Sequence, residues 1–141
     1  MVREIINEKA ISIPEVKEIL DKIITTEKID VKSVPIEGKD GEAGEAALPD
    51  TFEADKTKKY FLKSTYDYVQ TFSKMDARVA RNLVQKLVTE KQLPLFIAIQ
   101  IANINPDTKE ELALLLEKSQ KRLSGEEIEK LLFDIRSYKE Q

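Results

Sequence analysis

Apolar residues recur at helical spacing along most of the chain, and the clearest case is the segment 76–88. Its apolar positions match the template i, i+3, i+4, i+7, i+8 throughout and are Ala80, Leu83, Val84, Leu87 and Val88. This pattern is typical of a helix that buries one face. Asp76 stands before it and can accept hydrogen bonds from the backbone N–H groups of the first turn. The segment therefore predicts an amphipathic helix with its apolar side in a core.

The segment 94–116 predicts two helices separated by a sharp stop. The apolar face of the first is formed by Ile97, Ile101 and Ile104, and we expect that face to be buried. Pro106 disfavours helical geometry at Asn105 and lacks an N–H donor, so the first helix should end there. Thr108 can then cap the second helix in a capping box with Glu111.

Three further helices are predicted at 12–26, 56–72 and 124–138. The first and the last begin with a serine that is followed three residues later by a glutamate, which is the signature of a capping box. Their apolar residues recur at spacings of three and four. The chain therefore predicts about six helices and an all-α fold, with no repeat of fixed period.

The helix at 56–72 carries aromatic and basic residues on neighbouring faces. Its apolar side consists of Leu62, Tyr66, Val69 and Phe72, with Phe61, Thr65 and Tyr68 alongside, and we expect this aromatic side to be buried. Lys56, Lys59 and Lys63 recur at spacings of three and four. They form either a small basic patch that could contact RNA or an ordinary solvated helix face.

Residues 37–55 interrupt the helical pattern. They hold seven acidic residues against Lys39 alone and three of the four glycines of the chain, without a usable apolar period. Such a composition cannot bury enough apolar surface to offset the entropy of ordering, which predicts a flexible acidic linker over 36–55. A calcium loop is excluded because Asp40, Glu42 and Glu45 lack the ligand spacing around a central glycine.

The first eleven residues fit neither a helical nor an alternating template. Their large apolar residues are Val2, Ile5, Ile6 and Ile11. An extended segment of this kind is either an edge strand tied down by another protein or a frayed end. We divide the chain into an N-terminal extended segment and helix for partner docking (1–35), the linker (36–55) and a helical domain (56–141).

Composition excludes most catalytic chemistry. The 141 residues contain no cysteine and no histidine, which removes thiolate nucleophiles, imidazole bases and the usual zinc and haem ligands. There is no nucleophile elbow or phosphate-cradling loop. No apolar run approaches the roughly 20 residues that span a bilayer, and the N-terminus does not resemble a signal peptide. We expect a soluble cytoplasmic protein that is not an enzyme and needs no cofactor or metal.

The charge is unevenly distributed. The formal net charge is −3, of which residues 37–55 carry −6, so that the rest of the chain carries +3. A body charge of +3 is far below that of a dedicated nucleic-acid binder. The charge is therefore only weak support for contact with RNA or DNA.

Four blocks together resemble the archaeal RpoF family of RNA polymerase subunits, the counterpart of the fourth subunit of eukaryotic RNA polymerase II. The blocks are SIPEVKEIL at 12–20, TYDYVQTFSKMDARVARNLVQKLV at 65–88, IANINPDTKEELALLL at 101–116 and SGEEIEKLLFDIRSY at 124–138. The third is the most specific, and the residues that fill its family pattern are Asn103, Ile104, Pro106, Thr108, Glu111 and Leu112. The acidic segment is longer than in typical archaeal members.

This resemblance implies a non-catalytic polymerase subunit with an HRDC-like helical bundle, a domain type shared by certain helicases and ribonucleases. In that family the subunit pairs with RpoE, an elongated protein with an oligonucleotide-binding barrel, to form a stalk beside the RNA exit channel of the polymerase core. The stalk supports promoter opening with initiation factor E and guides nascent RNA. The alternative is a free-standing HRDC-like module that binds nucleic acid directly, which the weak body charge disfavours.

Partner contacts are expected where apolar residues have no obvious neighbour within the chain. The helix at 12–26 is separated from the body by the linker, so we expect it to gain little from packing on its own chain and to dock on RpoE. The expected interface residues are Val2, Ile5, Ile6, Ile11, Ile13, Val16, Leu20, Ile101, Asn103 and Pro106. The expected RNA contacts are Lys56, Lys59 and Lys63.

Overall fold

The computed structural model describes residue 5, residues 8–31 and residues 54–141, and all regular structure in these residues is helical. The predicted linker, together with Val2 and Ile6, lies outside the described residues. In chain order the helices are α1 Ile13–Glu27, α2 Ala54–Phe72, α3 Ala77–Thr89, α4 Leu95–Ile104, α5 Lys109–Leu116 and α6 Gly125–Lys139. The prediction of an all-α fold with helices in these places is confirmed.

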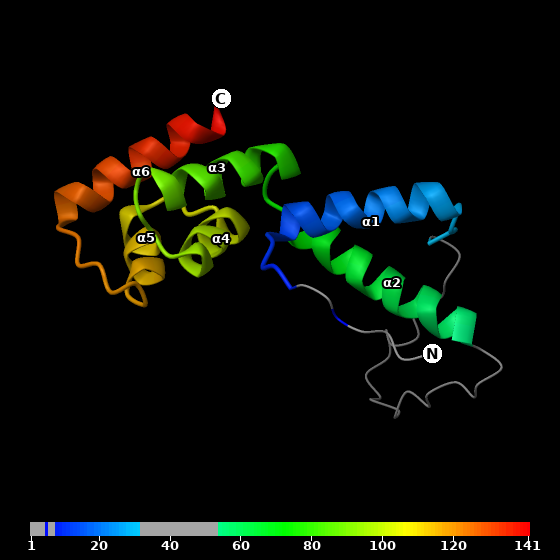
Figure 1. Ribbon diagram of the computed structural model, residues 1–141. Coiled ribbons are helices and arrows are strands. Elements are labelled where there is room, and N and C mark those ends of the chain that lie inside the picture. Colours follow the sequence, from blue (N-terminus) through cyan, green and yellow to red (C-terminus); the bar gives the residue numbers. More distant parts are fainter. Residues whose placement is uncertain (1–4, 6–7, 32–53) are drawn as a thin grey trace.

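The helices form an elongated arrangement (Figure 1). Helices α3 to α6 pack together as a bundle, in which α3 contacts α4 and α6, and α5 contacts α4 and α6. Helices α1 and α2 lie side by side and extend from one end of this bundle. Helix α1 also contacts α3 and α4. The molecule thus consists of a helical body, α3 to α6, and an arm, α1 and α2.

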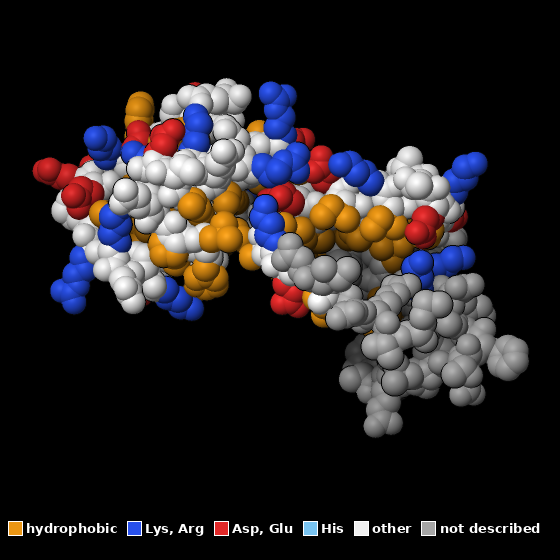
Figure 2. Space-filling model, viewed as in Figure 1, with side chains coloured by type: hydrophobic (Ala, Val, Ile, Leu, Met, Phe, Trp, Pro, Cys, Tyr) orange, Lys and Arg blue, Asp and Glu red, His pale blue; other side chains and the backbone are white. Residues whose placement is uncertain are grey.

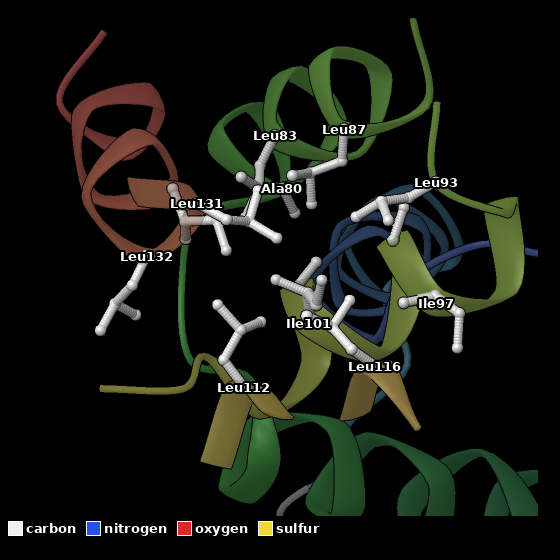
Figure 3. Close-up of a cluster of buried hydrophobic side chains, with 13 residues drawn as sticks. Ala80, Leu83, Leu87, Leu93, Ile97, Ile101, Leu112, Leu116, Leu131 and Leu132 are labelled. Atoms are coloured by element: carbon white, nitrogen blue, oxygen red, sulfur yellow. The ribbon is translucent and has the colours of Figure 1, made fainter. Parts of the chain in front are cut away.

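The core of the body is formed by the apolar stripes that the sequence predicts. The largest fully buried apolar side chains come from all four body helices and are Leu83, Leu87, Ile97, Ile101, Leu112 and Ile135. Figure 3 shows side chains of α3, α4, α5 and α6 converging on one centre. Each helix buries one face here because burial of apolar area is the main favourable term in folding. This core holds the body together.

The predicted helix ends are also present. The Arg78 N–H donates to the Asp76 carboxylate at 2.8 Å, so Asp76 caps α3. Helix α4 ends at Asn105, which adopts a left-handed φ of 54° before Pro106, a conformation that asparagine tolerates better than most residues. The side chains of Thr108 and Glu111 cap α5 reciprocally.

Two burial predictions are wrong. Phe61, Tyr68 and Phe72 of α2 are exposed, whereas the adjacent Val69 is buried. The reason is that, among the described helices, α2 makes its main contacts with α1 alone, so only one narrow face is covered. Ile104, expected on the buried face of α4, is half exposed because it lies in the last turn of that helix.

Tyr138 ties the end of α6 to α3 and gives the fold a pH dependence. Its hydroxyl donates to Glu90 Oε2 at 2.6 Å, and Lys86 Nζ lies 4.7 Å from its ring centroid. The hydrogen bond to the Glu90 carboxylate, followed by burial, raises the pKa of Tyr138 to about 12 from its ordinary value of 10.0. A raised pKa favours the neutral phenol in the folded state, so this stabilisation is complete below pH 10 and is lost as pH rises towards 12.

We therefore expect Tyr138→Phe to destabilise the protein at pH 8 and to become progressively less different from the unsubstituted chain as pH rises from 10 to 12. Urea unfolding at each pH measures the difference in unfolding free energy. Tyr60→Phe, at an exposed position of α2, serves as the control. A difference between Tyr138→Phe and the unsubstituted chain that stays constant up to pH 12 would contradict this assignment.

Candidate partner interface

Helix α1 is docked on the body at its N-terminal turn. Ser12 and Pro14 are buried, and the Ile13 N–H donates to Asn103 Oδ1 of α4 at 2.7 Å. Ser12 N–H and Oγ both donate to Glu15 Oε1, at 3.4 and 3.0 Å. The expectation that this helix finds little packing on its own chain is wrong, because α4 and α3 supply a surface for it.

A second contact holds α1 to α3 further along the helix. Arg81 donates from both terminal guanidinium nitrogens to the two carboxylate oxygens of Glu18, forming a forked ion pair. The hydrogen bond from Arg81 lowers the pKa of Glu18 below its ordinary value. Both charged groups reach solvent, so the pair contributes geometry more than stability.

The arm carries a line of exposed large apolar side chains. On α2 the exposed fractions are 56% for Phe61, 56% for Tyr68 and 46% for Phe72, while on α1 Ile19 is 46% exposed. The three aromatic residues recur at spacings of seven and four, so they share one face of α2. Figure 2 shows hydrophobic side chains gathered along this part of the molecule. We call these four residues the arm surface.

The arm surface has the properties of a protein-binding site. The Tyr68 and Phe72 rings lie together, with centroids 4.7 Å apart and planes tilted by 47°. Clusters of exposed aromatic side chains are uncommon on isolated proteins, and they mark interaction sites because burying them on a partner is favourable. Hydrophobic contact is therefore what this surface offers.

The structure places most of the predicted interface residues elsewhere than on an open surface. Ile5 is exposed, whereas Ile11, Ile13, Val16 and Leu20 are half-buried within the chain. Ile101 and Pro106 are fully buried, and Asn103 bonds to Ile13. Their predicted contact with a partner stays a prediction, but the last three have a clear role inside this chain.

The predicted basic patch on α2 is largely engaged with carboxylates. Lys63 is mostly buried and pairs with Asp67 at 3.3 Å, and Lys58 pairs with Glu27 of α1 at 3.7 Å. Lys59 is exposed, and the side chain of Lys56 lies outside the described residues. These pairs favour the solvated-face interpretation of the lysines, and they give the nucleic-acid module no support.

The arm surface was not predicted from the sequence, because its aromatic residues were assigned to the core. A signal was present: Phe61, Tyr68 and Phe72 form a second apolar stripe beside the one that contains Leu62 and Val69. A helix with a single neighbour can bury only one such stripe. An apolar face that is wider than one neighbour covers is therefore the feature that predicts an exposed docking surface.

No described helix is both long enough and apolar enough to cross a membrane. A search of curated proteins found no significant match to this sequence. The family model described as RNA polymerase Rpb4 matches residues 10–139, a range that contains all six helices and both contacts that hold α1 to the body. Because this match covers nearly the whole chain, the protein belongs to the RNA polymerase Rpb4 family.

Proposed function

We propose that this non-catalytic RNA polymerase subunit, of the archaeal RpoF type, forms a stalk heterodimer with RpoE. Membership of the family places it among the subunits of RNA polymerase. The observation that carries the finer proposal is the arm surface, where four large apolar side chains stand exposed on α1 and α2. Such a surface is stabilised when a partner removes it from water.

In this proposal the two ends of the chain have different roles. The arm surface docks on RpoE, and the N-terminal segment adds to a sheet of that protein by strand addition. The C-terminal helical domain, 56–141, supplies the HRDC-like part of the stalk. The stalk then works in the cytoplasm on the polymerase core, where it supports promoter opening with initiation factor E and guides nascent RNA.

The proposed division into 1–35, 36–55 and 56–141 also needs to accommodate the observed packing. Helix α1 contacts α2, α3 and α4, so a partner that meets α1 meets α2 as part of the same surface. Lys58 and Glu27 join the two helices at the far end of the arm. We therefore propose that RpoE recognises the arm as one unit.

Co-purification tests this function. When the chain is tagged and expressed at its natural level in the cells that encode it, we expect RpoE and the polymerase core subunits to co-purify in equal amounts with it. Mass spectrometry with quantification of each band measures the ratio. Recovery of the chain with the core but without RpoE would refute the stalk heterodimer. Recovery without any other polymerase component would refute the wider assignment.

A further inference from the structure

The direction of the arm relative to the body depends on few features of the chain. The covalent link between α2 and α3 is short, running from Ser73 to Asp76. An open groove of about 410 Å³ lies beside this link and is lined on one side by α1, from Pro14 to Thr26, and on the other by Met75, Asp76 and Ala77. Close packing therefore does not fill this side of the junction. Apolar contact is non-directional, so polar contacts are needed to set an angle.

The first polar contact joins the start of α1 to α4. The first N–H groups of a helix have no partner within the helix and are normally satisfied by a residue close in sequence. Here the N–H of Ile13 is satisfied by Asn103, which is 90 residues away. The neighbouring Ser12 and Pro14 are buried, so this bond lies at a protected point. Asn103 therefore fixes the position of the N-terminal end of α1.

The second polar contact joins the middle of α1 to α3. Arg81 grips both carboxylate oxygens of Glu18, and Glu18 lies five residues beyond Ile13, about 7.5 Å along the helix axis. A planar guanidinium that holds both oxygens constrains orientation as well as distance. A rod held at two separated points has a defined direction. The pairing of Lys58 with Glu27 then carries α2 along with α1.

We propose that Asn103 and Arg81 form a two-point latch that fixes the angle of the arm and so presents the arm surface in one orientation. Asn103 and Arg81 are positioning residues, since neither belongs to the arm surface. The latch is a property of the free chain. Its consequence for binding rests on the proposed function, because a pre-oriented surface loses less freedom when it meets RpoE.

Electron spin distance measurement tests the latch directly. The chain contains no cysteine, so Thr26→Cys on α1 and Gln85→Cys on α3, both at exposed positions, can carry the only two spin labels. Dilution with unlabelled chain removes contributions from contacts between copies. We expect one narrow distance distribution for the otherwise unsubstituted chain. We expect a broad or divided distribution after Asn103→Ala with Arg81→Ala.

Two further variants separate the latch from general damage. Gln100→Ala with Arg78→Ala changes an amide and a guanidinium on the same two helices and should keep the narrow distribution. Asn103→Asp keeps an oxygen acceptor for the Ile13 N–H, so with Arg81 intact it should restore the narrow distribution that Asn103→Ala widens. Arg81→Ala alone alters only an exposed pair, so it should widen the distribution while circular dichroism shows unchanged helix content. A narrow, unshifted distribution in a folded double alanine variant would overturn the latch.

Binding to RpoE gives a second and independent readout. If the stalk heterodimer exists, the double alanine variant should bind RpoE about tenfold more weakly, mainly through the lost pre-orientation. Equal affinity with a broadened distribution would show that the arm angle does not matter for binding and would overturn that part of the proposal. Failure of the unsubstituted chain to bind RpoE would refute the proposed function and leave the distance measurements as the test of the latch.

Discussion

Leu83→Ala and Leu112→Ala are each expected to lower the free energy of unfolding by roughly 2–5 kcal/mol. Both side chains are fully buried, Leu83 on α3 and Leu112 on α5, and both belong to the single core of the body. Truncation removes apolar contacts and leaves a cavity that the surrounding helices fill only in part. Urea unfolding followed by circular dichroism measures the loss.

The chain provides a matched control on the same helix. Leu114 lies two residues from Leu112 on α5 but is 65% exposed, so Leu114→Ala should change the unfolding free energy by less than about 0.5 kcal/mol. The pair therefore tests the rotation of α5 about its own axis. Similar losses for Leu112→Ala and Leu114→Ala would mean that this rotation is misassigned.

Phe61→Asp with Tyr68→Asp is expected to abolish binding to RpoE while leaving the body folded. Both side chains are more than half exposed, so the free chain should lose little stability. At a partner interface, however, two carboxylates would be desolvated without a counter-charge, which is strongly unfavourable. Val16 and Leu20 are poorer choices, because they are half-buried within the chain and charges there would also disturb α1.

A charge-matched control distinguishes a local effect from a general one. Lys59→Ser with Gln70→Asp changes the net charge by the same −2, and both positions are exposed on the side of α2 that faces away from Phe61. We expect this variant to bind RpoE normally. Size-exclusion chromatography of co-expressed pairs measures both variants. Normal pairing by the Phe61 and Tyr68 variant would place the interface elsewhere.

Local chemistry made the helices predictable. Ser124 and Thr108 with their glutamates, Asp76, and the Asn105-Pro106 stop define where helices begin and end through contacts within a few residues. The buried face of α3 was predictable for the same reason, because a helical period can be read from a short segment. The core of the body follows from these elements.

The arm was less predictable because it depends on contacts between distant segments. The period of α2 indicates an apolar face but not how many neighbours will cover it, and with α1 as its main neighbour the aromatic stripe stays exposed. The bond between Ile13 and Asn103 joins residues 90 positions apart. Nothing local to either residue announces it. Asn103 was predicted as an interface residue through a family resemblance, whereas its observed partner lies within the chain.

The mass of the purified complex tests most directly whether this polymerase subunit pairs with RpoE through its arm. The two proteins, co-expressed or mixed at micromolar concentration, should elute together with a light-scattering mass equal to one copy of each. The chain alone should self-associate through its exposed apolar surface. A monodisperse monomer that elutes separately from RpoE would contradict the pairing.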